Sequence, residues 1–270
     1  MSYKILIINP GSTSTKIGVF EDENLLFEET LRHTTEELAG FNLIVEQKDF
    51  RKKVILDILA EKNFDIKTLD VCVGRGGMLK PIPGGTYPVS DELLEDLKIG
   101  KQGQHASNLG AVIANAIATE LDVPAYIYDA VTVDELEPLA KVTGLPEMQR
   151  KGMGHNLNMR AAAMKYAKEN NKPYSDISVI VAHLGGGITL SLHHKGQIVD
   201  MISDDEGPFS PERAGGLPAF QVIDMATREG MGKKAMMKKV KTQGGLMGYF
   251  GVNDTRIVEK MMMDGDEKAK

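Results

Sequence analysis

The 270-residue sequence contains a single cysteine, Cys72, within an apolar, strand-like segment. One cysteine cannot form an internal disulfide, and this usage fits a protein of the reducing cytoplasm. The chain runs from M-S-Y-K directly into an apolar strand without the pattern of a signal peptide, and no apolar run reaches membrane-spanning length. We therefore expect a cytoplasmic protein with no membrane partner.

Positive charge is also in short supply. Lys and Arg total 32 against 38 Asp and Glu, which gives a net charge of −6 and a pI near 5.6. This balance argues against nucleic acid or an anionic membrane as a general partner. An anionic substrate would have to meet a local cluster of basic side chains. The length suffices for two domains, each with its own core.

Several catalytic patterns are missing. The phosphate-binding motif G-x-x-x-x-G-K-[ST] is absent, and no Ser-His-Asp arrangement is evident. The pair His193-His194 has no partner at a spacing typical of metal ligands, so we interpret it as an exposed strand end. These absences argue against a Walker-type nucleotide loop and against hydrolysis by a catalytic triad.

The most informative stretch that is present is the opening one, residues 3–20. A short apolar run at 5–8 predicts a buried strand, N-P-G at 9–11 must turn, and 15–20 predicts a second strand. The turn carries four hydroxyls at 12–15, a carboxamide at Asn9 and an ammonium at Lys16. Donors around a glycine turn suit the oxygens of a phosphate or carboxylate, although an ordinary polar hairpin has the same pattern.

The rest of the chain alternates strands and helices. Further strands are predicted at 24–32, 69–73, 125–128, 177–182, 188–192 and 197–202. Helices are predicted from 34 and at 47–62, 90–97, 109–121, 159–170, 219–228, 233–240 and 254–263, with a helix-forming acidic stretch near 134–135. Segments 80–88 and 204–216 are predicted loops, and the glycines at 244–248 separate the last two helices.

The opening pattern occurs twice. Strand, glycine turn, strand, turn and strand begin the chain and recur from Ile177, with Asn9 and His183 separated by 174 residues. The second turn, H-L-G-G-G-I-T-L, is followed by a strand and offers backbone amides to a phosphate chain. Two similar α/β units with phosphate-suited turns indicate duplicated domains with a cleft between them.

Four segments give the pattern a specific resemblance: I-N-P-G-S-T-S-T-K, V-G-R-G-G, H-L-G-G-G and G-P-F-S-P-E-R-A-G-G-L-P, in that order. They resemble the acetate/butyrate kinase family, most closely its butyrate kinases, over all 270 residues. The resemblance implies an α/β protein of two duplicated ribonuclease-H-like domains, the actin-like ATPase fold. The implied domains are residues 1–157 for acyl substrate and phosphate and residues 158–270 for the nucleotide.

The reaction implied by the resemblance is ATP-dependent phosphorylation of a short-chain carboxylate, with Mg²⁺, by direct in-line transfer. Butanoate is the implied substrate, and butanoyl phosphate and ADP are the products. Apolar residues that follow Arg75, among them Met78 and Leu79, favour an aliphatic chain over a sugar. The alternatives are a kinase for acetate, propionate or isobutyrate, and a non-catalytic actin- or Hsp70-like nucleotide-binding module. A homo-oligomer is also expected.

Carried over motif by motif, the resemblance assigns roles to individual residues. The catalytic set is Asn9, Arg75, His155 and Arg213; the cofactor-binding set is Ser12, Ser14, Lys16, His183, Gly185, Gly186, Gly187, Asp254 and Arg256; the magnesium residue is Asp129; and His105 and Asn108 are further candidates. Acetate kinases have an asparagine at the position of Gly186.

These residue types suit phosphoryl transfer, which needs positioning and neutralisation of charge more than covalent chemistry by the protein. Arginine and histidine donate hydrogen bonds where that charge develops. A carboxylate is already nucleophilic at pH 7, so no general base is needed. Each residue also has an ordinary structural interpretation: a surface arginine, a core or loop histidine, or, for Asp129, a cap.

The family resemblance also bears on the end of the chain. Family members continue past the position of Lys270 with a Gly-rich adenosine-binding segment, an acidic magnesium residue and a closing helix. We therefore expect a chain truncated within its nucleotide-binding domain, with reduced ATP affinity and carboxylate kinase activity.

Overall fold

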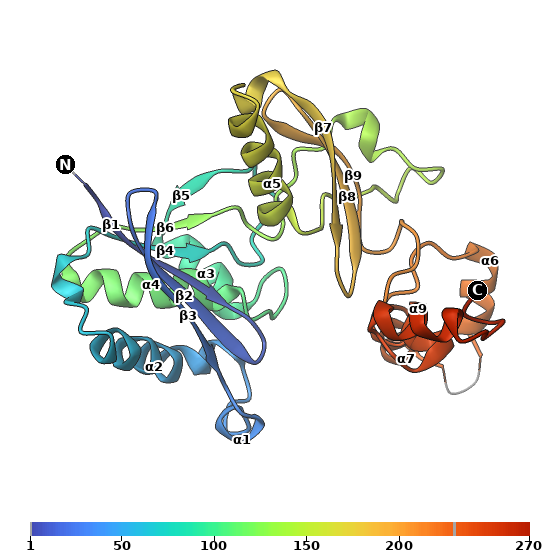
Figure 1. The fold of residues 1–270 in the computed structure, drawn as a ribbon, viewed down its shortest axis with the longest axis horizontal. Helices are drawn as coiled ribbons and strands as arrows, with labels where there is room; N and C mark the ends of the chain where they lie inside the picture. Colours follow the sequence, from blue (N-terminus) through green and yellow to red (C-terminus); the bar gives the residue numbers. More distant parts are fainter. Residues whose placement is uncertain (1, 229–230) are drawn as a thin grey trace. The chain divides into compact units, whose positions relative to one another are not determined.

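The computed structural model describes residues 2–228 and 231–270, and the chain forms two compact units, Met1–Asp134 and Glu135–Lys270 (Figure 1). This division falls earlier in the chain than the domain boundary predicted between residues 157 and 158. The segment 135–157, which contains His155, lies in the second unit. The assignment of the two parts to acyl substrate and nucleotide stays a prediction.

The first unit is built on a six-stranded sheet with the strand order β3-β2-β1-β4-β6-β5. The strands are β1 Lys4–Pro10, β2 Ser14–Glu21, β3 Asn24–Arg32, β4 Val71–Arg75, β5 Thr86–Pro88 and β6 Ala125–Tyr128. The first three form the predicted antiparallel meander, and β1, β4 and β6 run parallel to one another. The predicted strand positions in this unit are therefore confirmed.

Helices α2 Lys48–Glu61, α3 Asp91–Ile99 and α4 Asn108–Leu121 lie on one side of this sheet, and the short α1 Thr35–Leu38 follows β3 (Figure 1). Apolar side chains of β1, β2 and β4 pack against those of α2 and α4 in the main core. Capping side chains stand at two of the predicted helix starts: Thr34 forms a capping box with Glu37, and the Ser90 hydroxyl accepts a hydrogen bond from the Leu93 amide. Local capping chemistry thus sets where α1 and α3 begin.

Helix α4 approaches β4 unusually closely because two glycines face each other. A Cβ on Gly74 would lie 2.3 Å from the carbonyl carbon of Gly110, and a Cβ on Gly110 would lie 2.4 Å from the carbonyl oxygen of Arg75. Only hydrogen at both positions allows this backbone contact. The contact holds the end of β4, and with it Arg75, against α4.

The second unit contains a three-stranded antiparallel sheet, β7 Ser178–Leu184, β8 Ile188–His194 and β9 Gln197–Ile202. Strand β7 starts and ends 174 residues after β1, so the predicted repeat holds at both ends of the strand. Asn9 and His183 are each the penultimate residue of their strand. The duplicated meander is therefore confirmed.

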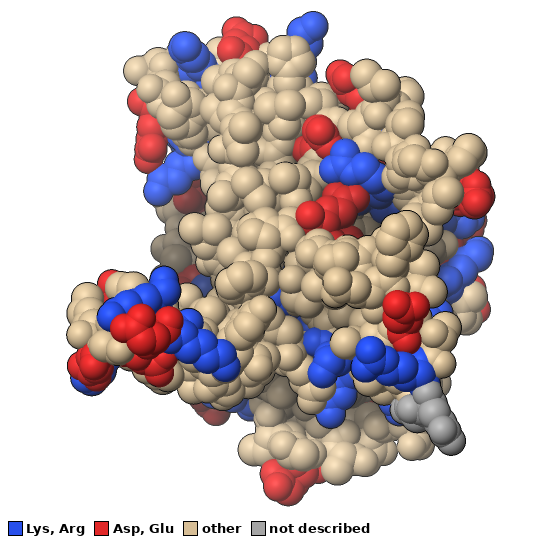
Figure 2. Space-filling view, turned by 90° about the vertical axis from the view of Figure 1, so that its right-hand side faces the viewer, with Lys and Arg blue, Asp and Glu red and all other residues tan. Residues whose placement is uncertain are grey.

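Helix α5 Asn156–Glu169 packs against β7 and β8, and it is followed in sequence by helices α6 Ala219–Ala226, α7 Lys233–Thr242, α8 Gly245–Phe250 and α9 Thr255–Met263. Five lysines lie on α7. Figure 2 is turned about the vertical axis of Figure 1, so α7 keeps its height there, and Lys and Arg side chains are seen at that height. The sheet face away from α5 exposes apolar side chains, including Ile180 and Leu184. Within the described residues, no helix is long and apolar enough to cross a membrane.

Two local predictions were wrong. The predicted loop at 80–88 ends in strand β5, which pairs with β6 at the sheet edge, where Pro88 is tolerated. The acidic stretch near 134–135 is not helical, because Glu135 is drawn into a buried ion pair with Arg160 and Pro138 follows. The glycines at 244–248 lie between α7 and α9 as predicted, but Gly245 and Gly248 belong to a short helix, α8, that was not predicted.

The prediction for His193 was also wrong, since its side chain is fully buried. One ring nitrogen lies 2.6 Å from the Tyr174 hydroxyl and the other 2.8 Å from the Ser191 hydroxyl. Burial, with a smaller effect from the charge of Arg160, lowers the pKa of His193 to about 4. The alternation of β8 turns His193 inward, so the side chain is a core residue.

Candidate active site

In the first unit, a row of polar side chains crosses the sheet at the end of β1. Asn9 is the register partner of Lys16 on β2, and the position beside Asn9 on β4 is Arg75. Because Leu6 and Ile8 point into the core, Asn9 points to the opposite face, away from the helices. The register of three strands therefore places three of the predicted site residues side by side.

Arg75 and Asn9 are in contact, since the Arg75 guanidinium lies 3.5 Å from the Asn9 amide oxygen. Burial lowers the pKa of Arg75, and burial together with the charge of Arg75 lowers the pKa of His105. The charge of Arg75 thus disfavours the charged form of His105 in a partly buried place. A bound anion would relieve this, so the electrostatics support the prediction of a phosphate or carboxylate ligand.

Asn108, a further candidate, has a structural role. Its side chain is buried, accepts the amide of Met78 at 2.9 Å and donates to the carbonyls of Leu97 and Gly103. These bonds fix the turn that follows Arg75 and leave little capacity for a ligand. His105 is held by Ser107, whose hydroxyl lies 2.7 Å from its Nδ1.

Asp129, the predicted magnesium residue, follows β6 and is buried in the first unit. Its carboxylate accepts the amide of Gly85 at 2.8 Å, and its backbone has a positive φ of 41°. No group of three or more His, Cys, Asp or Glu side chains in the described ranges is arranged to hold a metal ion. Mg²⁺ commonly uses one or two carboxylates together with substrate phosphates and water, so a single aspartate is compatible with a metal that arrives with ATP.

The first polar turn connects β1 and β2; of the predicted ligands, Ser12 lies in it and Ser14 is the first residue of β2. The turn is closed by a hydrogen bond from the Gly11 amide to the Ser14 carbonyl at 2.8 Å. Lys16 lies beyond the turn on β2, where its ammonium pairs with Glu28 at 2.9 Å and is half-exposed. The Lys16 ammonium is thus already paired with Glu28 of β3, and the groups of the turn that could bind a ligand are its hydroxyls and backbone amides.

Sequence reasoning missed Arg51, which lies on α2 and is 1% exposed. Its guanidinium donates to the carbonyls of Gly11, Ser12 and Ser14 and to the Thr15 hydroxyl. A signal was available: Arg51 stands four residues before Ile55, on the buried stripe of the helix. A charged residue on an apolar stripe indicates a buried polar partner.

In the second unit, Arg213 and the predicted second phosphate loop, 185–187, are in direct contact. A Cβ on Gly187 would lie 2.3 Å from Nη1 of Arg213, so the guanidinium rests on the glycine backbone. The Ser210 hydroxyl donates to the carbonyl of Gly186 at 2.8 Å, and the Glu212 amide donates to the same carbonyl at 3.0 Å. The S-P-E-R segment and the G-G-G segment therefore form one assembly.

The two predicted histidines of this unit are stacked. The rings of His155 and His183 lie 3.7 Å apart between centroids with a 6° interplanar angle, and Nδ1 of His155 lies 3.0 Å from the Thr189 hydroxyl. Burial, and then the charge of Arg213, lower the pKa of His183. The stack therefore places the two predicted histidines of this unit side by side, with Arg213 close enough to disfavour the charged form of His183.

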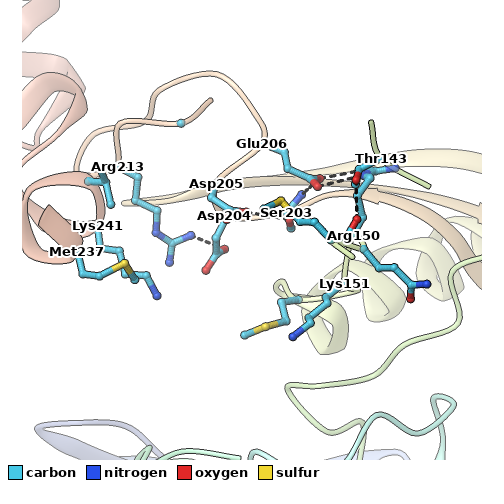
Figure 3. Close-up of a pocket in the computed structure, with 15 residues that line it drawn as sticks. Thr143, Arg150, Lys151, Ser203, Asp204, Asp205, Glu206, Arg213, Met237 and Lys241 are labelled. Carbon is cyan, nitrogen blue, oxygen red and sulfur yellow. Dashed lines mark hydrogen bonds and ion pairs between the residues drawn. The ribbon is translucent and has the colours of Figure 1, made fainter. Parts of the chain in front are cut away.

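Figure 3 shows a pocket of about 440 Å³ in the second unit, lined on one side by Arg213, Met237 and Lys241. Asp204 accepts a hydrogen bond from Arg213 at 2.5 Å across the pocket wall. On the other side, Arg150 is bound to Glu206. The pocket lining combines basic with acidic side chains, and both of its arginines are paired with carboxylates.

Asp254 and Arg256, predicted to contact the nucleotide, lie at the start of α9 and pair with each other at 2.6 Å. Hydrogen bonds from Arg256 lower the pKa of Asp254 to about 2. Asp254 also lines a second pocket of about 610 Å³, together with Gly185, Gly186 and Glu212. The structure thus brings Asp254 near the glycine loop, while the exposed Arg256 side chain is held beside it.

We expect the Asn9→Ala variant to lose far more turnover than the Lys16→Ala variant. Asn9 contacts Arg75 at the row of polar side chains, whereas Lys16 is already paired with Glu28, an exposed pair worth about 1 kcal/mol at most. Steady-state formation of acyl phosphate, trapped as the hydroxamate, measures both variants against wild type. A larger loss of turnover in Lys16→Ala would indicate that the phosphate binds beside Lys16 on β2 and not at the turn.

Comparison with known sequences finds one family model and relatives that match the whole length of this chain. The Acetokinase family matches residues 147–270. A probable butyrate kinase of Clostridium botulinum is 52% identical over 272 residues, which cover 100% of this chain and 77% of that protein. Butyrate kinase 1 of Clostridium acetobutylicum is 48% identical over 269 residues, which cover 99% of this chain and 76% of that protein.

Comparison with solved structures agrees with the fold. An acetate kinase of Porphyromonas gingivalis matches with a TM-score of 0.77 at 16% identity, over 99% of this chain and 75% of that one. A propionate kinase of Francisella tularensis matches with a TM-score of 0.72 at 17% identity, over 99% and 75%. The predicted α/β fold is therefore confirmed.

Proposed function

The chain belongs to the acetokinase family and is a carboxylate kinase, and we propose that it transfers the γ-phosphoryl group of ATP to butanoate. The observation that carries this proposal is the 52% identity with a probable butyrate kinase over the whole of this chain. The products are butanoyl phosphate and ADP. The roles of individual residues in this reaction are part of the proposal.

In the proposed step, a butanoate oxygen attacks the γ-phosphorus, a new P–O bond forms, and the bond to the β–γ bridging oxygen breaks with its electron pair leaving on ADP. No proton has to be removed from the nucleophile. Charge spread over the three equatorial oxygens is what the protein has to stabilise. This agrees with a site made of hydrogen-bond donors rather than of a base and a nucleophile.

Each unit carries donors suited to phosphate oxygens. In the first, the Asn9 side chain and the Arg75 guanidinium lie together, next to the hydroxyls of the first turn. In the second, Arg213 rests on the glycine loop and is oriented by Asp204, and the stacked pair of His155 and His183 lies in the same unit. We assign Arg75 and Arg213 to charge stabilisation and His155 to hydrogen bonding in the transition state.

We propose Mg²⁺ as the metal and Asp129 as the protein group that faces it. Bound with ATP, Mg²⁺ would neutralise part of the phosphate charge. Asp254 and Glu212, which line the pocket beside the glycine loop, are proposed to face the nucleoside.

The proposal also includes a location and an assembly state. We propose that the protein works in the cytoplasm, since its single cysteine, Cys72, is free, a usage that fits a reducing compartment. A homo-oligomer, which the family resemblance implies, is part of the same proposal.

The substrate is tested by hydroxamate formation with ATP and a panel of acetate, propionate, butanoate and isobutyrate. We expect the highest kcat/KM with butanoate, because one methylene in an apolar pocket is worth about 1–3 kcal/mol. A higher value with acetate or propionate would assign the chain to another carboxylate. ATP hydrolysis that no carboxylate increases would contradict the kinase assignment.

A further inference from the structure

The turn between β1 and β2 is held from behind by one buried cation. Arg51 donates to the carbonyls of Gly11 at 2.8 Å, Ser12 at 3.0 Å and Ser14 at 2.9 Å. Its remaining hydrogen bonds go to the Thr15 hydroxyl and to the side-chain oxygen of Gln47, which immediately precedes α2. Every donor nitrogen of the guanidinium is used, and most of its partners belong to the turn.

These bonds fix the direction of the amides in the turn. In a trans peptide, the carbonyl and the N–H of the next residue point in opposite directions. The carbonyls of Gly11 and Ser12 face Arg51, so the amides of Ser12 and Thr13 face away from it. Within residues 2–228 and 231–270, neither amide donates to a protein acceptor. Two adjacent, outward-facing amides form a suitable site for an anion.

The charge of Arg51 has no anionic partner in the part of the chain that the structure describes, because no carboxylate lies within 4.0 Å of its guanidinium and its acceptors are all neutral. A buried guanidinium without a carboxylate is costly unless an anion is bound nearby. The His33 ring, 2.9 Å from the Thr15 hydroxyl, experiences this charge: after burial, it is the next cause that lowers the pKa of His33.

We propose that Arg51 is a positioning residue for the phosphoryl group: it orients the amides of Ser12 and Thr13 toward the anion and supplies uncompensated positive charge behind the turn. This rests on the proposed function, in which a phosphate binds at the first turn. Arg51 lies on the opposite side of the turn from those amides and acts through the backbone.

The test is titration of the protein with inorganic phosphate, followed by the amide NMR signals of residues 11–15, which localise binding to this turn. We expect Arg51→Met, which keeps an unbranched stem but removes the charge and the fork, to weaken phosphate binding about tenfold or more. Arg51→Lys keeps the charge without the fork and should lie between Arg51→Met and wild type.

Arg51→Met also destabilises the fold because it leaves buried carbonyls without donors. Leu59→Ala is the matched control, since Leu59 is a fully buried residue of the same helix and its truncation costs about 2–5 kcal/mol without touching the turn. Both variants are titrated well below their melting temperatures. We expect the phosphate affinity of Leu59→Ala to equal that of wild type.

Three results would overturn the proposal. Wild-type affinity in Arg51→Met would show that Arg51 does not act on the anion, and would leave the proposed function intact. An equal loss in Leu59→Ala would show that the effect is general destabilisation. If the amide signals of residues 11–15 in the wild-type protein did not respond to phosphate, phosphate would not bind at this turn. That result would also contradict this part of the proposed function.

Discussion

Replacing Arg213 with alanine is expected to lower turnover about 100-fold or more, since one donor to a developing oxyanion is worth that much. The guanidinium rests on Gly187 of the second glycine loop and is oriented by Asp204. Its loss removes a donor and leaves the loop in place, because the loop is held by Ser210 and by the backbone of Glu212. Hydroxamate formation under saturating ATP and butanoate measures the effect.

The matched control is Lys241→Ala, which removes a positive charge from the same pocket without touching the glycine loop. We expect its turnover to stay within a few-fold of wild type, and both variants to melt close to wild type, because the ion pair between Arg213 and Asp204 is partly exposed. Turnover near the wild-type level in Arg213→Ala, with the fold intact, would remove Arg213 from the catalytic set.

Replacing Gly110 with alanine is expected to lower the melting temperature of the first unit by about 8 °C, from a net loss of about 2 kcal/mol. Alanine favours a helix by about 1 kcal/mol over glycine, but its Cβ would lie 2.4 Å from the Arg75 carbonyl oxygen, and such overpacking costs about 3 kcal/mol. The cost of the clash exceeds the gain in helix propensity because the atom that the Cβ meets belongs to the backbone and cannot rotate away. Calorimetric melting measures the change.

Gly40→Ala is the control for the substitution itself. Gly40 lies in the first unit, is exposed and has no atom within 4 Å of an added Cβ. We expect its melting temperature to match wild type or rise slightly, since alanine restricts the unfolded chain. If Gly110→Ala were as stable as Gly40→Ala, α4 would be free to move away from β4 and would not fix the position of Arg75.

The parts of the fold that sequence could predict are those governed by local chemistry. The apolar run of β1, the strand β2 and the helix starts at Thr34 and Ser90 each depend on neighbouring residues, and all are present. The turn predicted at N-P-G begins later, at Gly11, because Asn9 and Pro10 still pair with β2. The repeat could be found for the same reason, since both copies carry the same local pattern. The family motifs added candidates in both units.

The parts that could not be predicted depend on contacts between distant residues. Glu135 is not helical because it pairs with Arg160, and His193 is buried because β8 turns it toward Tyr174. The contacts of Arg51 with the first turn cross about 40 positions, and the stack of His155 on His183 joins a helix start to a strand end. Residue type suggested candidates for the site, but only tertiary structure shows which of them touch.

The parallel pairing of β1 with β4 has a consequence for folding. Asn9 and Arg75 are 66 positions apart, so their contact requires a long loop to close before it forms. Pairings of this separation are slow, and helices such as α2 and α4 can form earlier from local contacts. The anion site of the first unit is thus absent from partly folded chains. A ligand of this site binds only the completed sheet, and by mass action it raises the stability of the native state.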